Sequence, residues 1–229
     1  MLYFTNPCTP RVAAAMRDGQ LGYIDTPRQG NRRPRDVEWC ADNGRFGKGW
    51  PGPDAWWAWL SANAADAGTC AFAVAPDVVT DAAATLAESL PWLPRIRRLG
   101  YRAAFVAQDG AELVGVPWGD IDVLFLGGST RWKLGPHARA LVAQAQGRGV
   151  PVHMGRVNSG RRFRYAAAIG CASADGTFLT FGPESNLPRV LAWIRTADQL
   201  PLPLPVERLY RVSGRVAICA SRSPPASMR

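Results

Sequence analysis

Eight short apolar runs recur along the chain, and helical or loop segments separate them. Most runs are continuous rather than alternating, which is typical of parallel strands covered on both faces. The runs are Leu2–Thr5, Leu21–Ile24, Val37–Ala41, Ala71–Ala75, Ala103–Ala107, Val123–Leu126, Val152–Met154 and Thr177–Phe181. Their number and spacing constrain the fold class more than any other feature of the sequence.

Helical patterns fill several of the intervals, and they cover Thr80–Leu90, His137–Gln146 and Leu187–Ile194. Thr80 and Asp81 are capping candidates for the first helix, and Pro188 suits the first turn of the last. The polar, basic stretch Thr26–Arg35 is expected to be a long loop.

This alternation predicts an α/β fold, a compact TIM-type (β/α)8 barrel over residues 1–200, slightly smaller than the typical ~250 residues. A doubly wound sheet is the competing fold, but no glycine fingerprint follows the first run. Residues 201–229 are expected to be a Pro-rich spacer and a basic C-terminal tail.

The formal charge of the 229 residues is +9, and Lys48 and Lys133 are the two lysines in an otherwise arginine-based excess. A GC-rich coding sequence would explain this excess of arginine over lysine equally well, without any functional reason. The field of this charge nevertheless attracts polyanions, which favours a nucleic-acid partner over an acidic protein surface.

Five cysteines are scattered so that no two lie within four residues, which predicts neither a zinc ribbon nor a CxxC redox pair. We expect most of them to be buried thiols in a reducing compartment. With no signal-peptide pattern and no apolar window of membrane-spanning length, the sequence predicts a cytoplasmic protein without membrane contact.

In a barrel, residues that follow the strands form the functional face. Here these segments are Asp42-Asn43-Gly44, Pro76-Asp77, Gln108-Asp109-Gly110, Gly127-Gly128-Ser129-Thr130 and Gly155-Arg156-Val157-Asn158, with Asp175-Gly176 at the start of the eighth run. Any single pair is explained equally well as a turn. Together they offer two carboxylates for glycosidic chemistry, one as nucleophile and one as proton carrier. An amide and exposed backbone N–H groups would complement a purine edge.

Several of these motifs, in this order, resemble the tRNA-guanine transglycosylase superfamily. They are Asp42-Asn43-Gly44-Arg45-Phe46, Ala75-Pro76-Asp77, Val106-Ala107-Gln108-Asp109-Gly110, Leu126-Gly127-Gly128 and His153-Met154-Gly155, followed by Asp175. The likeness is closer to its DNA-modifying branch, the DpdA-like deazapurine DNA modification proteins, and spans roughly Tyr23 to Pro183.

The resemblance implies that Asp175 is the nucleophile and Asp42 the second carboxylate. Asp77 and Gln108 would read the guanine edge, backbone N–H groups of Gly127 and Gly128 would reach it, and Met154 would pack on its face. The competing interpretations are a turn for Asp77 and Asp175 and a core position for Met154.

Two departures from the family bear on the substrate. The CxC spacing of the family's zinc site is absent, so we expect no metal or cofactor. Lys133 stands where the family has an acid, which favours a neutral incoming base such as 7-cyano-7-deazaguanine over an aminomethyl cation.

A basic cluster follows the sixth and seventh runs, on the expected functional side, and comprises Arg131, Lys133, Arg156, Arg161, Arg162 and Arg164. We expect phosphate contacts there, with a solvated basic surface as the alternative. The target base must leave the duplex. Trp132 or a tryptophan of Trp50–Trp59 would stack in the gap, unless Trp50–Trp59 packs a helix. His137 and His153 are expected to be structural.

The predicted function is therefore the exchange of guanine in DNA for a free 7-deazaguanine base, with possible protein partners from a DNA-modification system. If phage-encoded, the protein would act in the host cytoplasm. The alternatives are a tRNA-guanine transglycosylase, a glycosylase that removes the base, and a non-catalytic nucleic-acid-binding barrel that assists a larger subunit.

Overall fold

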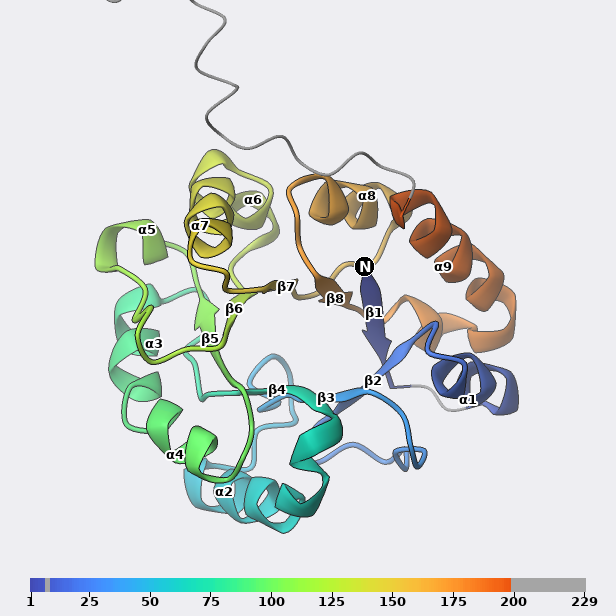
Figure 1. Ribbon diagram of the computed structural model, residues 1–229, viewed down its shortest axis with the longest axis horizontal. Helices are drawn as coiled ribbons and strands as arrows, with labels where there is room; N and C mark the ends of the chain where they lie inside the picture. Colours follow the sequence, from blue (N-terminus) through green and yellow to red (C-terminus); the bar gives the residue numbers. More distant parts are fainter. Residues whose placement is uncertain (7–8, 199–229) are drawn as a thin grey trace, which may run out of the picture.

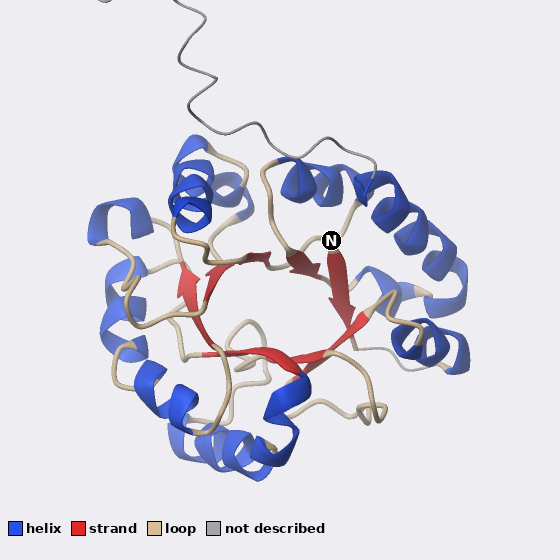
Figure 2. Cartoon of the chain, in the orientation of Figure 1, coloured by secondary structure: helices blue, strands red, loops and turns tan. Residues whose placement is uncertain are grey.

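The computed structural model describes residues 1–6 and 9–198, and the proposed spacer and tail lie outside this part. Eight strands pair in parallel and in chain order to close a barrel, and helices surround it (Figures 1 and 2). The strands are β1 Leu2–Thr5, β2 Gly22–Asp25, β3 Trp39–Ala41, β4 Cys70–Val74, β5 Ala103–Ala107, β6 Val123–Leu126, β7 Val152–Met154 and β8 Ser173–Asp175. The predicted TIM-type (β/α)8 barrel is confirmed.

The prediction of the last strand is wrong. Thr177–Phe181 contains the 3-10 helix η2, Phe178–Phe181, and the side chain of Phe181 is 82% exposed. The eighth strand is instead the short, polar β8, which closes the barrel by pairing Leu2 with Ser173 and Phe4 with Asp175. Asp175 therefore lies at the carboxyl end of a strand, and Asp42, Asp77 and Gln108 follow the carboxyl ends of β3, β4 and β5.

The other elements have the bounds α1 Pro10–Arg17, α2 Pro53–Ala62, η1 Ala64–Thr69, α3 Ala82–Ser89, α4 Leu93–Arg98, α5 Ala111–Val114, α6 Thr130–Lys133, α7 Pro136–Gly147, α8 Gly160–Ala168 and α9 Pro183–Asp198. Asp81 caps α3, because its carboxylate accepts the N–H of Ala84 at 2.9 Å. The expectation for Pro188 is corrected: α9 begins at Pro183, so Pro188 lies inside the helix. Thr26–Arg35 is a loop, as predicted.

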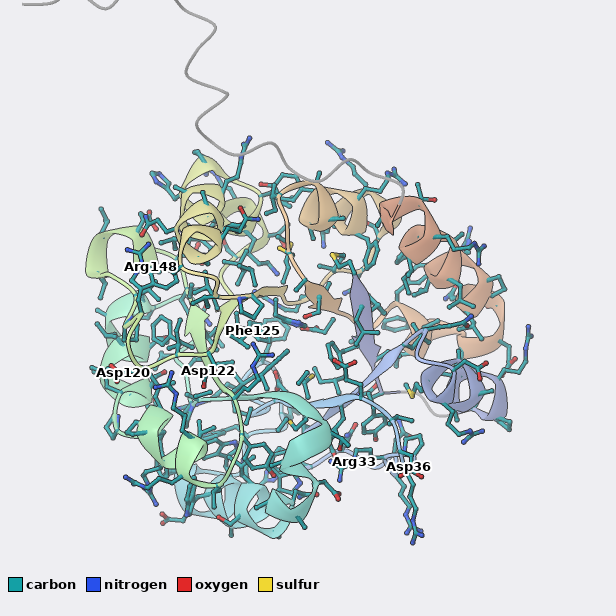
Figure 3. All side chains as sticks on the ribbon, viewed as in Figure 1. Arg33, Asp36, Asp120, Asp122, Phe125 and Arg148 are labelled. Atoms are coloured by element: carbon teal, nitrogen blue, oxygen red, sulfur yellow. The ribbon has the colours of Figure 1, made fainter. Side chains whose placement is uncertain are left out.

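Alternation along the strands divides the core into two layers. Phe4, Phe72, Val106 and Phe125 face the barrel interior, and Figure 3 shows Phe125 inside the ring of strands. Their sequence neighbours face the surrounding helices and form the larger cluster. Each position just beyond a strand is thus fixed by two packed layers, which gives a rigid base for side chains at the carboxyl end.

The tryptophan-rich segment Trp50–Trp59 serves helix packing. Trp56 of α2 is fully buried, and its ring meets that of Trp92 edge to face at 5.2 Å. Cys40, Cys70 and Cys171 are buried free thiols, as predicted, whereas Cys8 and Cys219 lie outside the described residues. Among residues 1–6 and 9–198, no helix has the length and apolar character needed to cross a membrane.

Candidate functional site

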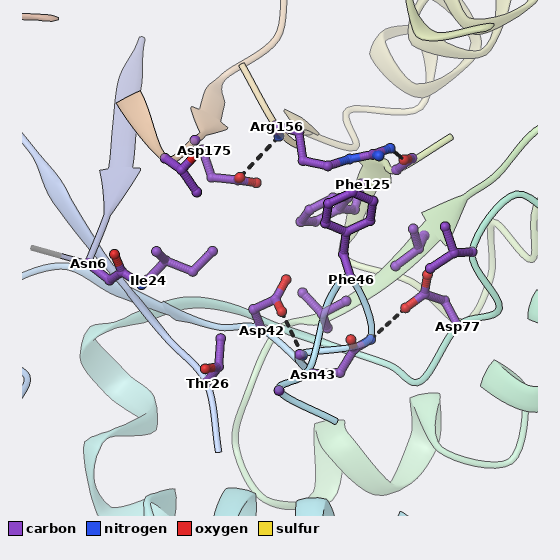
Figure 4. A pocket seen from close by; sticks show the side chains of 18 of the residues that line it. Asn6, Ile24, Thr26, Asp42, Asn43, Phe46, Asp77, Phe125, Arg156 and Asp175 are labelled. Atoms are coloured by element: carbon purple, nitrogen blue, oxygen red, sulfur yellow. Dashed lines mark hydrogen bonds between the residues drawn. The ribbon is translucent and has the colours of Figure 1, made fainter. Parts of the chain in front are cut away.

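A cavity of about 300 Å³ opens at the carboxyl ends of the strands (Figure 4). Each strand, or the loop that follows it, contributes a polar or glycine residue to the wall: in chain order, Asn6, Thr26, Asp42, Asp77, Gln108, Gly127, Arg156 and Asp175. Ile24, Val74, Val106 and Phe125 add apolar surface. The cavity brings together six residues that the sequence predicted, and it is the size of a small-molecule site (about 300 to 1,000 Å³).

Asp175 ends β8 and points into the cavity from one side (Figure 4). Its Oδ1 accepts the backbone N–H of Arg156 at 3.0 Å, and its Oδ2 lies 2.9 Å from Nε2 of His153. Burial raises the pKa of Asp175, but the bond and charge of His153, the Arg156 N–H and the charge of Lys133 outweigh burial and lower it. Asp175 is therefore ionised at neutral pH.

Asp42 follows β3 and faces the same cavity from the opposite wall. Its Oδ1 accepts the N–H of Gly44 at 2.7 Å. Burial raises the pKa of Asp42 to about 7, against the Gly44 hydrogen bond, and the charges of Asp175 and Asp77 add to the rise. The site therefore holds two carboxyl groups with opposite pKa shifts, the arrangement that separates a nucleophile from an acid–base group.

Asn43, Asp77 and Gln108 form a hydrogen-bonded wall. The Asn43 amide donates to Oδ1 of Asp77 at 2.8 Å, and the Gln108 amide donates to Oδ2 at 2.6 Å. The N–H of Thr80 in turn donates to Oε1 of Gln108 at 3.0 Å, from a left-handed backbone (φ 66°) that is unusual for a β-branched residue. The wall fixes the orientation of both amides. Asn43, absent from the predicted site, lies next to Asp42 in the same strand-end motif.

Arg156 belongs to the wall of the cavity and is half-buried. Its guanidinium donates to the carbonyl groups of Gly127 and Gly128 and lies over the ring of Phe46, 4.2 Å from the centroid. Phe46 is 64% exposed and lines the cavity mouth. Arg156 was expected to contact a phosphate. In the structure it is a wall residue whose guanidinium packs against the ring of Phe46.

The role predicted for the backbone N–H groups of Gly127 and Gly128 is wrong. Both N–H groups donate to the carbonyl of Ala107, at 3.0 and 3.2 Å, so neither is available to a base. A Cβ on Gly127 would clash with Val106, and one on Gly128 with Asp109 and Trp132. These glycines are explained by close packing rather than by ligand binding.

Two further predictions are corrected by burial. Met154 is 1% exposed and faces the helices, because His153 before it faces the barrel interior and side chains alternate along β7. Lys133 is 3% exposed, and its Nζ donates to the carbonyl of Gly155. It can neither contact a phosphate nor meet the incoming base, since it does not line the cavity.

Of the remaining basic residues, Arg131, Arg161 and Arg164 are exposed and Arg162 is half-buried, all near the carboxyl ends of the strands. Trp132 is 9% exposed and its Nε1 donates to Glu112 at 2.9 Å, so it does not project as a stacking wedge. His137 lies in the first turn of α7, as predicted. Among the described residues, no group of three His, Cys, Asp or Glu side chains is placed to hold a metal ion.

No protein-family model matches the sequence, and neither does any curated protein. Solved structures do resemble the fold. Tryptophan synthase from M. tuberculosis, in an open form with BRD0059 bound, is 14% identical with a TM-score of 0.52 and covers 87% of this chain and 92% of its own. The native KDPGal structure is 14% identical with a TM-score of 0.51, and the match covers 87% of this chain and 96% of that chain. The fold thus defines the class, a TIM-type barrel, and at this identity the likeness extends no further.

Proposed function

We propose that the chain is a nucleic-acid base-exchange enzyme, a transglycosylase that replaces guanine in DNA by a 7-deazaguanine. One observation carries the proposal: Asp175 and Asp42 face a single cavity, with the pKa of Asp175 lowered and that of Asp42 raised to about 7. Glycosidic displacement through a covalent intermediate needs such a pair, one carboxylate always ionised and one able to gain and lose a proton near neutrality.

In the first step, a carboxylate oxygen of Asp175 attacks the anomeric carbon of the target nucleotide. The glycosidic C–N bond breaks, its electron pair leaves with guanine, and protonated Asp42 supplies the proton that the base needs. In the second step, Asp42 takes a proton from the incoming base, whose nitrogen attacks the same carbon and displaces Asp175. Two displacements retain the configuration of the sugar.

The wall of Asn43, Asp77 and Gln108 complements a guanine edge. Each Asp77 oxygen accepts one hydrogen bond from the wall, and a carboxylate oxygen has further lone pairs for N–H donors such as those of guanine. The exposed ring of Phe46 at the mouth offers a stacking face for a planar base.

The choice of incoming base rests on the sequence resemblance, because buried Lys133 is outside the cavity and gives no reason to prefer a neutral base. The test is incubation with guanine-labelled DNA, and separately with labelled tRNA, together with 7-cyano-7-deazaguanine or its aminomethyl analogue. Release from DNA with incorporation supports the proposal. Release from tRNA alone, release without incorporation, or salt-sensitive binding without release would favour, respectively, the tRNA enzyme, a glycosylase, or a binding barrel.

A further inference from the structure

A second hollow, of about 510 Å³, lies between the end of α6 and the first turns of α8. Its walls are formed by Leu134, Ser159, Arg161, Arg162 and Tyr165. Ser159 is three residues beyond Arg156 of the cavity wall, a span of at most about 11 Å. A strand with one nucleotide in the cavity therefore passes close to this hollow.

The side chains around the hollow give it a positive charge. Arg161 and Arg162 occupy the first turn of α8, which contains no acidic residue, and Arg139 of α7 is close enough to Tyr165 to lower its pKa against the effect of burial. Across residues 1–6 and 9–198, none of these three arginines forms an ion pair with a carboxylate. Like charges placed together without a counter-ion favour an anionic ligand.

The polar groups of the hollow are suited to a phosphate group. Guanidinium groups bind phosphate oxygens through paired N–H donors, which gives geometric specificity as well as charge. Tyr165 forms part of the wall, and burial raises the pKa of its hydroxyl. The oxygen of Ser159 accepts the N–H of Arg162 at 3.3 Å, which leaves its own proton for a ligand.

We propose that this hollow binds a backbone phosphodiester of the nucleic-acid strand beside the target nucleotide and so holds the strand while the target sugar occupies the cavity. The inference rests on the proposed function and narrows the predicted basic surface to one site. Arg161 and Arg162 bind the phosphate, whereas the Arg156 guanidinium is held in the cavity wall by Gly127 and Gly128 and Lys133 is buried.

The test is the salt dependence of binding to a single-stranded guanine-containing oligonucleotide. For the double variant Arg161→Gln/Arg162→Gln we expect weaker binding, with the slope of log K against log salt shallower by roughly one to two units. Arg17→Gln/Arg98→Gln removes two exposed charges from the last turns of α1 and α4, at the opposite end of the barrel, and should leave the slope unchanged. Arg161→Lys/Arg162→Lys should keep most of the slope but lose affinity.

An equal loss in both Gln variants would overturn the site, since it would reduce it to general charge. Inorganic phosphate alone distinguishes a free phosphorylated ligand from a strand: saturable binding of phosphate without binding of the oligonucleotide would also overturn it. The outcome is separable from that of the proposed function. If the protein forms a covalent adduct with DNA but the slope is unchanged in the Gln variant, the phosphate site is rejected and the proposed enzyme stands. If the slope is reduced but neither adduct nor base release is found, the proposed enzyme is rejected and the phosphate site stands.

Discussion

Nε2 of His153 lies 2.9 Å from Oδ2 of Asp175, inside the barrel and away from solvent. Nδ1 of the same ring lies 2.8 Å from Oγ of Ser173, and the rings of Phe72 and Phe125 pack around it at 4.9 and 4.5 Å. Because an ionised carboxylate can only accept, Nε2 of His153 carries the proton of this hydrogen bond. His153 is therefore a positioning residue that holds Asp175 ionised and oriented.

His153→Phe should raise the pKa of Asp175, because it removes the hydrogen bond while keeping an aromatic ring in the aromatic interior. The acid limb of the pH profile for adduct formation should then move to higher pH, together with a fall in the maximal rate. Ser173→Ala is the matched control, since it leaves the bond to Asp175 in place. An acid limb at the same pH in all three proteins would contradict the role assigned to His153.

Replacing each carboxylate separates the two chemical roles. Asp175→Asn should abolish the denaturation-resistant protein–DNA adduct, because no nucleophile remains. Asp42→Asn should still form the adduct, but more slowly by roughly 10²- to 10⁴-fold, the usual contribution of proton transfer. Mass spectrometry of the denatured complex measures both. An adduct that survives Asp175→Asn and disappears in Asp42→Asn would reverse the assignment.

The pKa of Asp42 predicts opposite pH dependences for the two steps. Protonated Asp42 is needed when guanine leaves, so single-turnover adduct formation should decline above about pH 7. Ionised Asp42 is needed when the new base enters, so resolution of the adduct should decline below that pH. Quenched single-turnover reactions at a series of fixed pH values measure the rate of each step. In Asp42→Asn both limbs should be lost, and their persistence would assign them to another group.

The barrel could be predicted because parallel strands are apolar on both faces. β1, β5, β6 and β7 begin and end where the runs do. β8 could not be predicted this way, since Ser173 and Asp175 are polar and pairing with β1 defines the strand. A short apolar run such as Thr177–Phe181 fits a surface turn as well as a strand.

The strand ends predicted which loops form the candidate site, but they do not determine the direction of each side chain. His153 and Met154 are neighbours on β7, and a difference of one residue places the first against Asp175 and the second among the helices. Burial of Lys133 depends on how α6 packs over Gly155, a tertiary contact that no local pattern encodes. Asn43 could have been predicted from the sequence, because it is an amide next to Asp42 in the same motif.

The wall around Asp77 should determine recognition of the free base. Asn43→Ala removes the donor that orients Oδ1 of buried Asp77, a hydrogen bond to a carboxylate worth about 1.5–3 kcal/mol, and should weaken inhibition by free guanine roughly 10- to 100-fold. Competition by guanine and by hypoxanthine, which lacks the exocyclic amine, measures this loss and the preference between them. Asn63→Ala is the control, because it deletes an amide side chain at the C-terminal end of α2, away from the cavity. Equal competition by the two bases in the wild-type protein would show that Asp77 does not read the amine.

Lys133 links stability to pH. Burial, and then the charge of Arg156, lower the pKa of Lys133 to about 7, whereas an unfolded lysine titrates near 10.4. Between these values the unfolded chain binds more protons than the folded one, so this residue makes the protein more stable as pH rises. Lys133→Met fills the same space without a titrating group. The free energy of unfolding of the wild type, minus that of the variant, should therefore increase between pH 7 and 8.5, by at most about 1.4 kcal/mol per unit. Urea titrations of both proteins measure this difference, and groups common to both cancel. A difference that is constant or falls with pH would mean that Lys133 is charged in the folded protein and paired with Asp175.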